Sequence, residues 1–242
     1  MERKLQRLSW KSVRDLVPDK VDTVLFPVGT IEAHGPAAIG TDNLIPESIA
    51  EYLADRINAL IAPTLNYGIT KSLYGYPGSI TIQPPNFESI VKDILKSFYD
   101  NGFEKVIVLN GHGGNNSALK SAAHEFYYLY RVRIAVIHWW ELCADLVEEF
   151  YGQSGAHAGL DENAMVQAID ESLVDESLYD EDMVYFYRPG ANVYPIPGSI
   201  LLFKKNEGLP DFDAERSREY QQKVFKKIEE FLIEVLGRWE KI

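Results

Sequence analysis

The 242-residue sequence has a single cysteine, no long apolar run and a deficit of positive charge. Cys143 has no partner in the chain, so the fold cannot depend on an internal disulfide. No apolar run approaches the ~20 residues that span a bilayer, which excludes a transmembrane helix. The first residues, MERKLQRLSWKSV, are charged but lead into no apolar segment of a secretory signal. We therefore expect a cytoplasmic protein.

The charge balance narrows the class of partner. Acidic residues outnumber basic ones 36 to 24, which gives a formal net charge of −12. The resulting field repels nucleic acids and anionic membranes, so we expect neither as a partner. Internal repeats, low-complexity tracts and Pro/Ser-rich linkers are also absent. We expect one domain spanning residues 1–242.

The hydrophobic pattern alternates between strands and helices. Two successive strand–loop–helix units predict an α/β fold with a parallel sheet that helices cover on both faces. The predicted strands are 23–28, 61–65, 105–110 and 132–138. The predicted helices are 46–60, with Pro46 in its first turn, a segment from Asn86 to Gly102, 117–130 and an amphipathic C-terminal helix at about 213–239.

Three good metal ligands follow the first predicted strand in the stretch VGTIEAHGPAAIGTDN. Glu32 and His34 are two residues apart, so in an extended backbone both side chains point to the same side. The glycines and the proline of the GPAAIGT segment let a loop turn back and bring Asp42 to the same point. Carboxylates and imidazoles without a thiolate suit zinc, manganese or iron.

A fourth ligand candidate, His112, stands between glycines in LNGHGGNNS, directly after the strand at 105–110. The backbone N–H groups of this turn could instead hold an anion. However, the turn lacks the Lys-Ser/Thr ending of a nucleotide-binding P-loop. Ligands of open α/β sheets gather at the carboxyl ends of the strands. We therefore expect His112 to lie at the same sheet edge as Glu32 and His34.

Four segments now form a recognisable series: PVGTIEAHGPAAIGTD, PGSITI, VLNGHGGNN and HAGLDEN, in this order within about residues 8–166. The series resembles the successive motifs of the creatininase family. The resemblance implies a three-layer α/β/α fold with a mostly parallel central sheet. It also implies two divalent metal ions per subunit (zinc, manganese or iron) and a homo-oligomer, often a hexamer. The implied reaction is hydrolysis of a C–N bond in a cyclic amide or formylamine.

The resemblance also implies roles for the ligand candidates. Glu32 and His112 would hold one ion and His34 the other, with Asp42 bridging both. Such a pair can generate hydroxide at neutral pH, because a bound metal lowers the pKa of its water toward ~7, while the second metal polarises the carbonyl oxygen.

The later HAGLDEN motif supplies the remaining roles. Some family members place an acidic ligand two residues after the histidine of the third motif, but Gly114 stands there. Glu162 is therefore the expected last ligand, with Asp161 as the alternative. His157 resembles the catalytic histidine of the family, which would pass a proton to the leaving nitrogen.

The sequence offers three aromatic candidates for contacts with the substrate. Trp139 and Trp140 follow the strand at 132–138, and an indole there could wall a flat substrate or belong to the core. Tyr74, in a loop rich in glycine and tyrosine, is a third candidate. This loop reads Ser72-Leu73-Tyr74 where a histidine is often found in the family.

Two other classes of function compete with an amidohydrolase. A two-metal phosphate-ester hydrolase predicts lysine or arginine near the ligands, but neither occurs in residues 27–43 or 109–119. A non-catalytic protein that binds a metal or a metabolite predicts tight metal retention without turnover. The leading hypothesis is a metal-dependent amidohydrolase with His157 as its catalytic residue.

Overall fold

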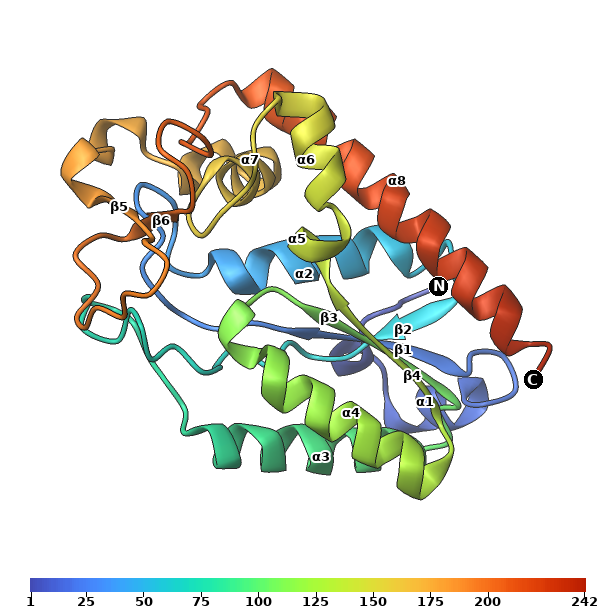
Figure 1. Ribbon diagram of the computed structural model, residues 1–242. Helices are drawn as coiled ribbons and strands as arrows, with labels where there is room; N and C mark the ends of the chain where they lie inside the picture. The colour runs from blue at the N-terminus through green and yellow to red at the C-terminus, as the bar shows by residue number, and fades with distance from the viewer.

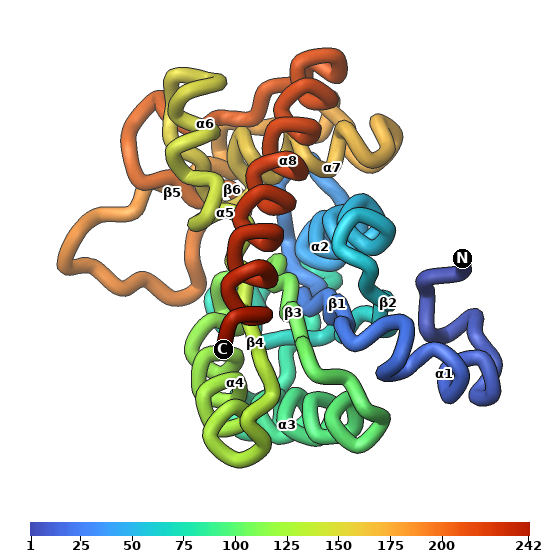
Figure 2. Tube along the Cα trace, turned by 90° about the vertical axis from the view of Figure 1, so that its right-hand side faces the viewer, coloured from blue at the N-terminus to red at the C-terminus, as the bar shows by residue number.

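A parallel four-stranded sheet with the strand order β2-β1-β3-β4 lies at the centre of the molecule. The computed structural model describes residues 1–242 (Figure 1). The strands are β1 (Thr23–Val28), β2 (Ala59–Ile61), β3 (Lys105–Asn110) and β4 (Arg133–His138). Figure 2 looks along the strands, so that β4, β3, β1 and β2 follow one another across the view between the helices of the two faces.

The two central strands place the functional loops. Every residue of β1 and β3 is buried, as expected for parallel strands that helices cover on both faces. The register pairs Val28 with Asn110, so the two strands end at the same level. The loop that carries Glu32 and His34 therefore begins beside the loop that carries His112.

Helices cover both faces of the sheet (Figure 1). One face carries α3 (Pro84–Asp100) and α4 (Asn116–Tyr130), and the other carries α2 (Thr41–Leu53), α7 (Leu160–Ile169) and α8 (Ala214–Trp239). Each face has its own apolar core, one of 24 and one of 19 buried residues. This arrangement confirms the predicted three-layer α/β/α fold.

The remaining elements are short. Three helices flank the sheet, and a small parallel pair of strands lies outside it, next to 3-10 turns between residues 171 and 183. None of the helices combines the length and apolarity needed to cross a bilayer. The flanking helices and the paired strands are α1 (Trp10–Leu16), α5 (Trp139–Leu142), α6 (Ala144–Tyr151), β5 (Val184–Phe186) and β6 (Ile200–Leu202).

The structure differs from the sequence-based boundaries around α2. The predicted helix 46–60 was wrong at both ends, because α2 runs from Thr41 to Leu53. The strand predicted at 61–65 is β2, which ends at Ile61, so residues 62–65 lie outside it.

Pro46 lies inside α2, where its missing N–H leaves the Asp42 carbonyl without the usual helical donor. Gly111 packs against this carbonyl, since a Cβ there would lie 2.0 Å from the oxygen. The first turn of α2 is thereby pressed against the end of β3.

Candidate metal centre

Five predicted ligands converge at the carboxyl edge of the sheet. Glu32 and His34 come from the loop after β1, His112 from the turn after β3, and Asp42 and Glu162 from the first turns of α2 and α7. Each residue is at most 8% exposed. Buried charged groups are rare unless they are paired or bind a cation, so the cluster requires compensation.

Asp42 lies between two histidines. Its Oδ1 is 3.0 Å from Nε2 of His34, and its Oδ2 is 2.9 Å from Nδ1 of His112. Oδ2 is buried yet has no hydrogen-bond partner in suitable geometry. Ligand atoms of Glu32, Asp42 and His112 lie within 4.8 Å of one another, as do those of His34, Asp42 and Glu162. The two groups share only Asp42, so together these residues could hold two divalent cations.

Backbone carbonyls fix the orientation of the three histidines near the cluster. In each of them one ring nitrogen lies 2.9–3.0 Å from a carbonyl oxygen, to which it donates. The opposite nitrogen then presents a lone pair to the cluster, as in histidines that ligate metals. The carbonyls are those of Glu32, Ile69 and Ala33, for His34, His112 and His157 respectively.

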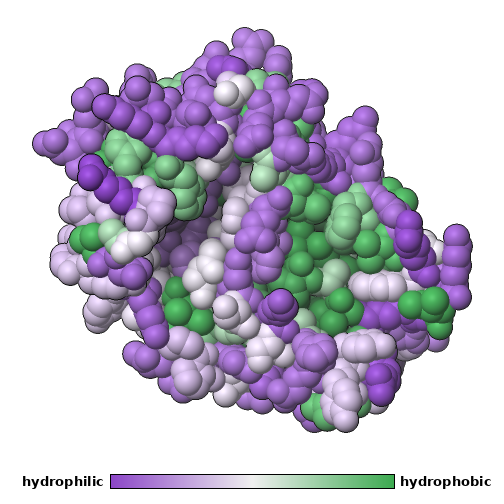
Figure 3. Space-filling view, viewed as in Figure 1, coloured by the Kyte–Doolittle hydropathy of each residue, from purple (hydrophilic) through white to green (hydrophobic).

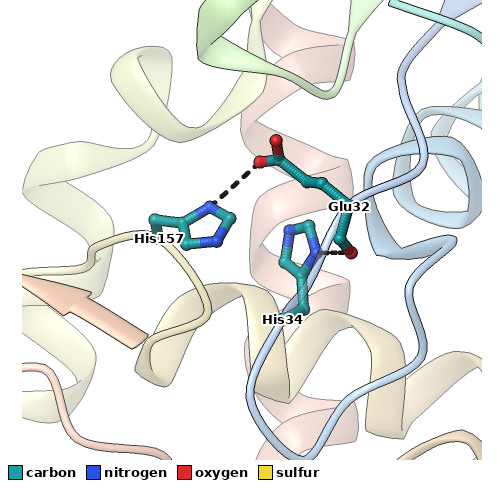
Figure 4. A group of neighbouring side chains, drawn as sticks. All are labelled: Glu32, His34 and His157. Carbon is teal, nitrogen blue, oxygen red and sulfur yellow. Dashed lines mark hydrogen bonds and ion pairs between the residues drawn. The ribbon is translucent and has the colours of Figure 1, made fainter. Parts of the chain in front are cut away.

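His157 lies beside His34 and faces the carboxylate of Glu32 (Figure 4). Its Nδ1 is 3.5 Å from Oε1 of Glu32, and its ring centroid is 4.4 Å from that of His34. Its side chain is 19% exposed, against 9% or less for those of His34 and His112. Burial and the neighbouring His34 lower the pKa of His157 to about 4, so the imidazole is neutral at pH 7.

The pKa values of His34, His112 and Glu162 favour their protonated forms in the absence of a cation. Burial alone would lower the pKa of His34, but the carboxylates of Asp42, Glu162 and Glu32 outweigh burial and raise it to about 10. At His112, the carboxylates of Glu32 and Asp42 likewise outweigh burial and raise the pKa to about 9. Burial raises the pKa of Glu162 to about 8. The donor set of imidazoles and carboxylates therefore fits divalent cations.

The two candidates for the last acidic ligand lie in different surroundings. Glu162 Oε2 is 3.6 Å from Nε2 of His34, within the cluster. Asp161 accepts a hydrogen bond from the N–H of Ala156 at 3.0 Å and belongs to neither ligand group. Gly114 leaves no room for a ligand side chain, since a Cβ there would lie 2.1 Å from the Ile69 carbonyl oxygen.

Three residues that support the ligands were missed by the sequence reasoning. Thr70 donates a hydrogen bond to Glu32 from a position outside the quoted motifs. Asn115 is fully buried and joins two loops, donating to the Gly29 carbonyl at 3.1 Å and accepting from the Ile69 N–H at 3.0 Å. Asn110 accepts from the His112 N–H at 3.2 Å. The asparagines were visible in LNGHGGNN, but their partners are distant in sequence.

A cleft of about 390 Å³ opens onto the cluster. Figure 3 shows this hollow beside the β5–β6 region. His112, His157 and Glu162 line its floor, and Trp140, Tyr187 and Phe203 line its walls together with Ser72 and Leu73. No lysine or arginine lines the cleft.

Two of the three aromatic substrate candidates lie elsewhere. Trp139 is 1% exposed and belongs to the core on the α8 face, and Tyr74 is 62% exposed beside the cleft rather than in it. Trp140 lines the wall next to Glu141, and Gly113 of the His112 turn lies close to its ring.

Comparison with protein families supplies the context for this geometry. The family model described as "Creatininase: Creatinine amidohydrolase" matches residues 6–228. The chain belongs to the creatininase family. It is 27% identical over 209 residues to the creatinine amidohydrolase of Pseudomonas putida, covering 78% of this chain and 80% of the relative. It is 28% identical over 165 residues to the mycofactocin precursor peptide peptidase of Mycolicibacterium smegmatis, covering 64% and 62% of the two chains.

Solved creatininase structures share the fold of this family member. A crystal structure of creatinine amidohydrolase superimposes with a TM-score of 0.81 at 21% identity, covering 96% of each chain. A creatininase variant of "Zn-Zn type" gives a TM-score of 0.80 at 22% identity, and a manganese form gives 0.78 at 21% identity, each covering 97% of this chain and 98% of the other.

Proposed function

We propose that this chain is a dinuclear-metal hydrolase that cleaves the C–N bond of a small cyclic amide or formylamine. The observation that carries the proposal is Asp42, whose two oxygens face separate histidines at 3.0 and 2.9 Å. A single carboxylate in this position is suited to bridge two cations. The creatinine amidohydrolase of Pseudomonas putida, whose match covers 78% of this chain, supports an amide substrate.

Each of the two proposed cations would have its own set of ligands. Glu32, Asp42 and His112 would hold one cation, and His34, Asp42 and Glu162 the other. When bound, such a pair acidifies water and polarises a carbonyl group. The backbone bonds to the histidines keep their lone pairs aimed at the cations, and Thr70 holds the second oxygen of Glu32.

His157 is the proposed catalytic residue. Its Nε2–H is fixed by the Ala33 carbonyl, so only Nδ1 can exchange a proton with a molecule in the cleft. The imidazole can take a proton from the attacking water and return it to the leaving nitrogen, which must be protonated before an amine departs. Asp161 holds the preceding residue, Ala156, and thereby positions the histidine loop.

The cleft favours a small substrate without a negative charge. Its volume of about 390 Å³ is in the range of small-molecule sites. Trp140 offers a flat wall for a heterocycle. The absence of lysine and arginine from the lining speaks against a phosphate-ester substrate, whose developing charge such side chains would stabilise.

Several expectations from the sequence accompany this proposal. We propose zinc, manganese or iron as the metals, and relatives solved in a Zn–Zn and a manganese form support the first two. We also propose a single domain over residues 1–242, a cytoplasmic location and a homo-oligomeric assembly, on the grounds given by the sequence and its family resemblance.

The test is a substrate screen with protein reconstituted separately with zinc, manganese and iron. Creatinine, hydantoins, lactams and formylamino-pyrimidines are offered, and C–N cleavage is followed by the appearance of the amine or carboxylate product. We expect turnover of one class by the metal-loaded protein and none after chelation. Metal-loaded protein that ignores every amide but hydrolyses a phosphate ester would overturn the proposal in favour of the phosphate-ester class.

A further inference from the structure

The acidic side chains that line the cleft fall into two sets. Glu32 and Glu162 belong to the ligand groups of the candidate metal centre, and Asp161 is buried and accepts a hydrogen bond from a backbone N–H. The other two carboxylates of the lining, Glu141 and Glu148, are exposed and belong to no ligand group. Neither of these two forms an ion pair with a basic side chain. Their charges therefore face the cleft uncompensated.

Glu141 is fixed in place by a chain of side-chain amides. It lies in α5, which follows β4 directly and stands beside the cleft (Figure 1). Its Oε1 accepts a hydrogen bond from Asn116 at 3.1 Å, and the side-chain oxygen of Asn116 accepts one from Asn110 at 2.9 Å. The same Asn110 amide donates to the His112 carbonyl at 2.8 Å. The carboxylate of Glu141 is thus tied to the turn that carries a candidate metal ligand.

An aromatic face stands next to this carboxylate. Trp140 precedes Glu141 and lines the same cleft, and a Cβ on Gly113 would lie 3.8 Å from Cζ2 of the Trp140 ring. A carboxylate beside an indole is a suitable pair for an organic cation, because the face of the ring carries partial negative charge. No lysine or arginine lines the cleft, so an anionic group would find no counter-charge at this wall.

The metal centre does not remove the charge of the wall. Two divalent cations would bring four positive charges to the three carboxylates of Glu32, Asp42 and Glu162, so they would compensate the floor. Glu141 and Glu148 would still leave two negative charges above it. A cleft lined by charge of one sign concentrates ligands of the opposite sign, and the formal net charge of −12 adds to the attraction.

We propose that the substrate is an amide that carries a protonated amine, and that Glu141 binds this amine while Glu148 adds electrostatic attraction. The inference rests on the proposed function, because the carbonyl group of the same amide would face the metal centre. The amine would lie against Trp140 and Glu141. A cleft of about 390 Å³ holds a small molecule, so only a few bonds separate the amine from the C–N bond that is cleaved.

The test compares two lactams of the same ring and nearly the same size. Pyroglutaminol carries a hydroxymethyl group and is neutral, whereas the corresponding aminomethyl lactam is a cation at neutral pH. Their dissociation constants are measured by NMR titration of the full-length, zinc-loaded protein. We expect the aminomethyl lactam to bind about ten-fold more tightly, since an exposed ion pair and a cation–π contact act together. This preference should shrink when the salt concentration is raised from about 0.05 to about 0.5 M.

Two charge-removing variants assign the preference to the wall. Glu141→Gln keeps the shape of the side chain, and we expect about four-fold weaker binding of the aminomethyl lactam with unchanged zinc content. Binding of pyroglutaminol should stay within about two-fold of the parent. Adding Glu148→Gln should bring the two lactams within about two-fold of each other. The matched control is Glu149→Gln, which removes the same charge from an exposed residue of α6 outside the cleft lining and should keep the parent preference.

Two results would each overturn the proposal. One is a parent protein that binds the aminomethyl lactam no more tightly than pyroglutaminol. The other is a preference that persists in the Glu141→Gln/Glu148→Gln variant, which would mean that the amine ligates the zinc instead of contacting the wall. The readout is binding rather than turnover. Either result therefore leaves the hydrolase proposal standing, and a failure of the substrate screen leaves the preference between the two lactams measurable.

Discussion

The floor and the wall of the cleft are built in different ways. The floor consists of candidate metal ligands at the ends of central strands and in the first turns of helices, and Glu32, His34 and Asp42 are each 1% exposed. Part of the wall comes from β5, β6 and their loops, where Tyr187 stacks on Phe203 at 5.3 Å between ring centroids and Phe203 is 66% exposed. In the proposed function, the chemistry would thus lie on the rigid sheet and the substrate contacts on its periphery, where sequence can change without disturbing the candidate metal ligands.

The largest expected effect concerns the residue shared by both ligand groups. Asp42→Asn keeps the shape of the side chain but removes the charge that faces His34 and His112. We expect fewer than two metals per chain and a loss of turnover of about 10⁴-fold or more, because both cations depend on it. Elemental analysis and the rate on the substrate found in the screen measure the two effects.

The control for this variant is Glu148→Gln, an exposed carboxylate on the cleft wall, which should retain both metals. An Asp42→Asn protein with two tightly bound metals would show that the floor does not depend on a bridging carboxylate. The division of the cleft into a metal-binding floor and a substrate-binding wall would then be wrong.

The second prediction separates catalysis from metal binding within the floor. His157→Ala should leave the metal content unchanged, because His157 is absent from both groups that share Asp42. It should lower kcat by about 10²–10⁴-fold through loss of proton transfer. His124→Ala, an exposed histidine on α4, is the matched control. A loss of one metal in His157→Ala would instead assign His157 to the ligand set with Glu32 and His34.

The same contrast explains what could be predicted from the sequence. The bounds of β1 and β3 were predicted without error, since buried parallel strands appear as uninterrupted apolar runs. Because parallel strands end at a common edge, Glu32, His34 and His112 were expected to meet there, and Glu32 does share one ligand group with His112 and another with His34. Glu162 required the family resemblance, because its loop has no strand before it that would fix its place.

The wall could not be predicted in this way. Trp139 and Trp140 are adjacent and chemically identical, and only the turn of α5 decides that one is buried in the core and the other lines the cleft. Tyr187 and Phe203 are far apart in sequence and meet through the pairing of β5 with β6, three-residue strands that carry no hydrophobic period. Thr70 and Asn115 act through partners that only the folded chain brings near.

A third prediction removes the metals and follows stability with pH. The folded pKa values of His34, about 10, and of His112, about 9, exceed the ordinary value of 6.5, so their stabilising effect is complete below pH 6.5 and is lost as pH rises through 9–10. The pKa of Glu162 is raised from 4.5 to about 8, so its contribution to stability is likewise lost as pH rises from 4.5 to 8.

Chelated protein should therefore unfold at lower temperature at pH 9.5 than at pH 6. The drop should reach several degrees, since about 1 kcal/mol corresponds to ~2–4 °C in a chain of this size. Metal-loaded protein should lack this drop, because cations take the place of the protons. Thermal unfolding followed by circular dichroism at both pH values measures it. Equal pH profiles with and without chelator would mean that the metals bind elsewhere.

The smallest expected effect tests the wall. Tyr187→Ala removes an aromatic surface from the cleft but touches no predicted ligand. We expect KM to rise about five-fold with kcat nearly unchanged, since an aromatic contact of this kind contributes about 1 kcal/mol. Tyr194→Ala, 73% exposed and outside the cleft lining, is the matched control. If kcat fell with KM constant, the wall would contribute to the transition state, and specificity and chemistry would share one set of residues instead of being divided between periphery and sheet.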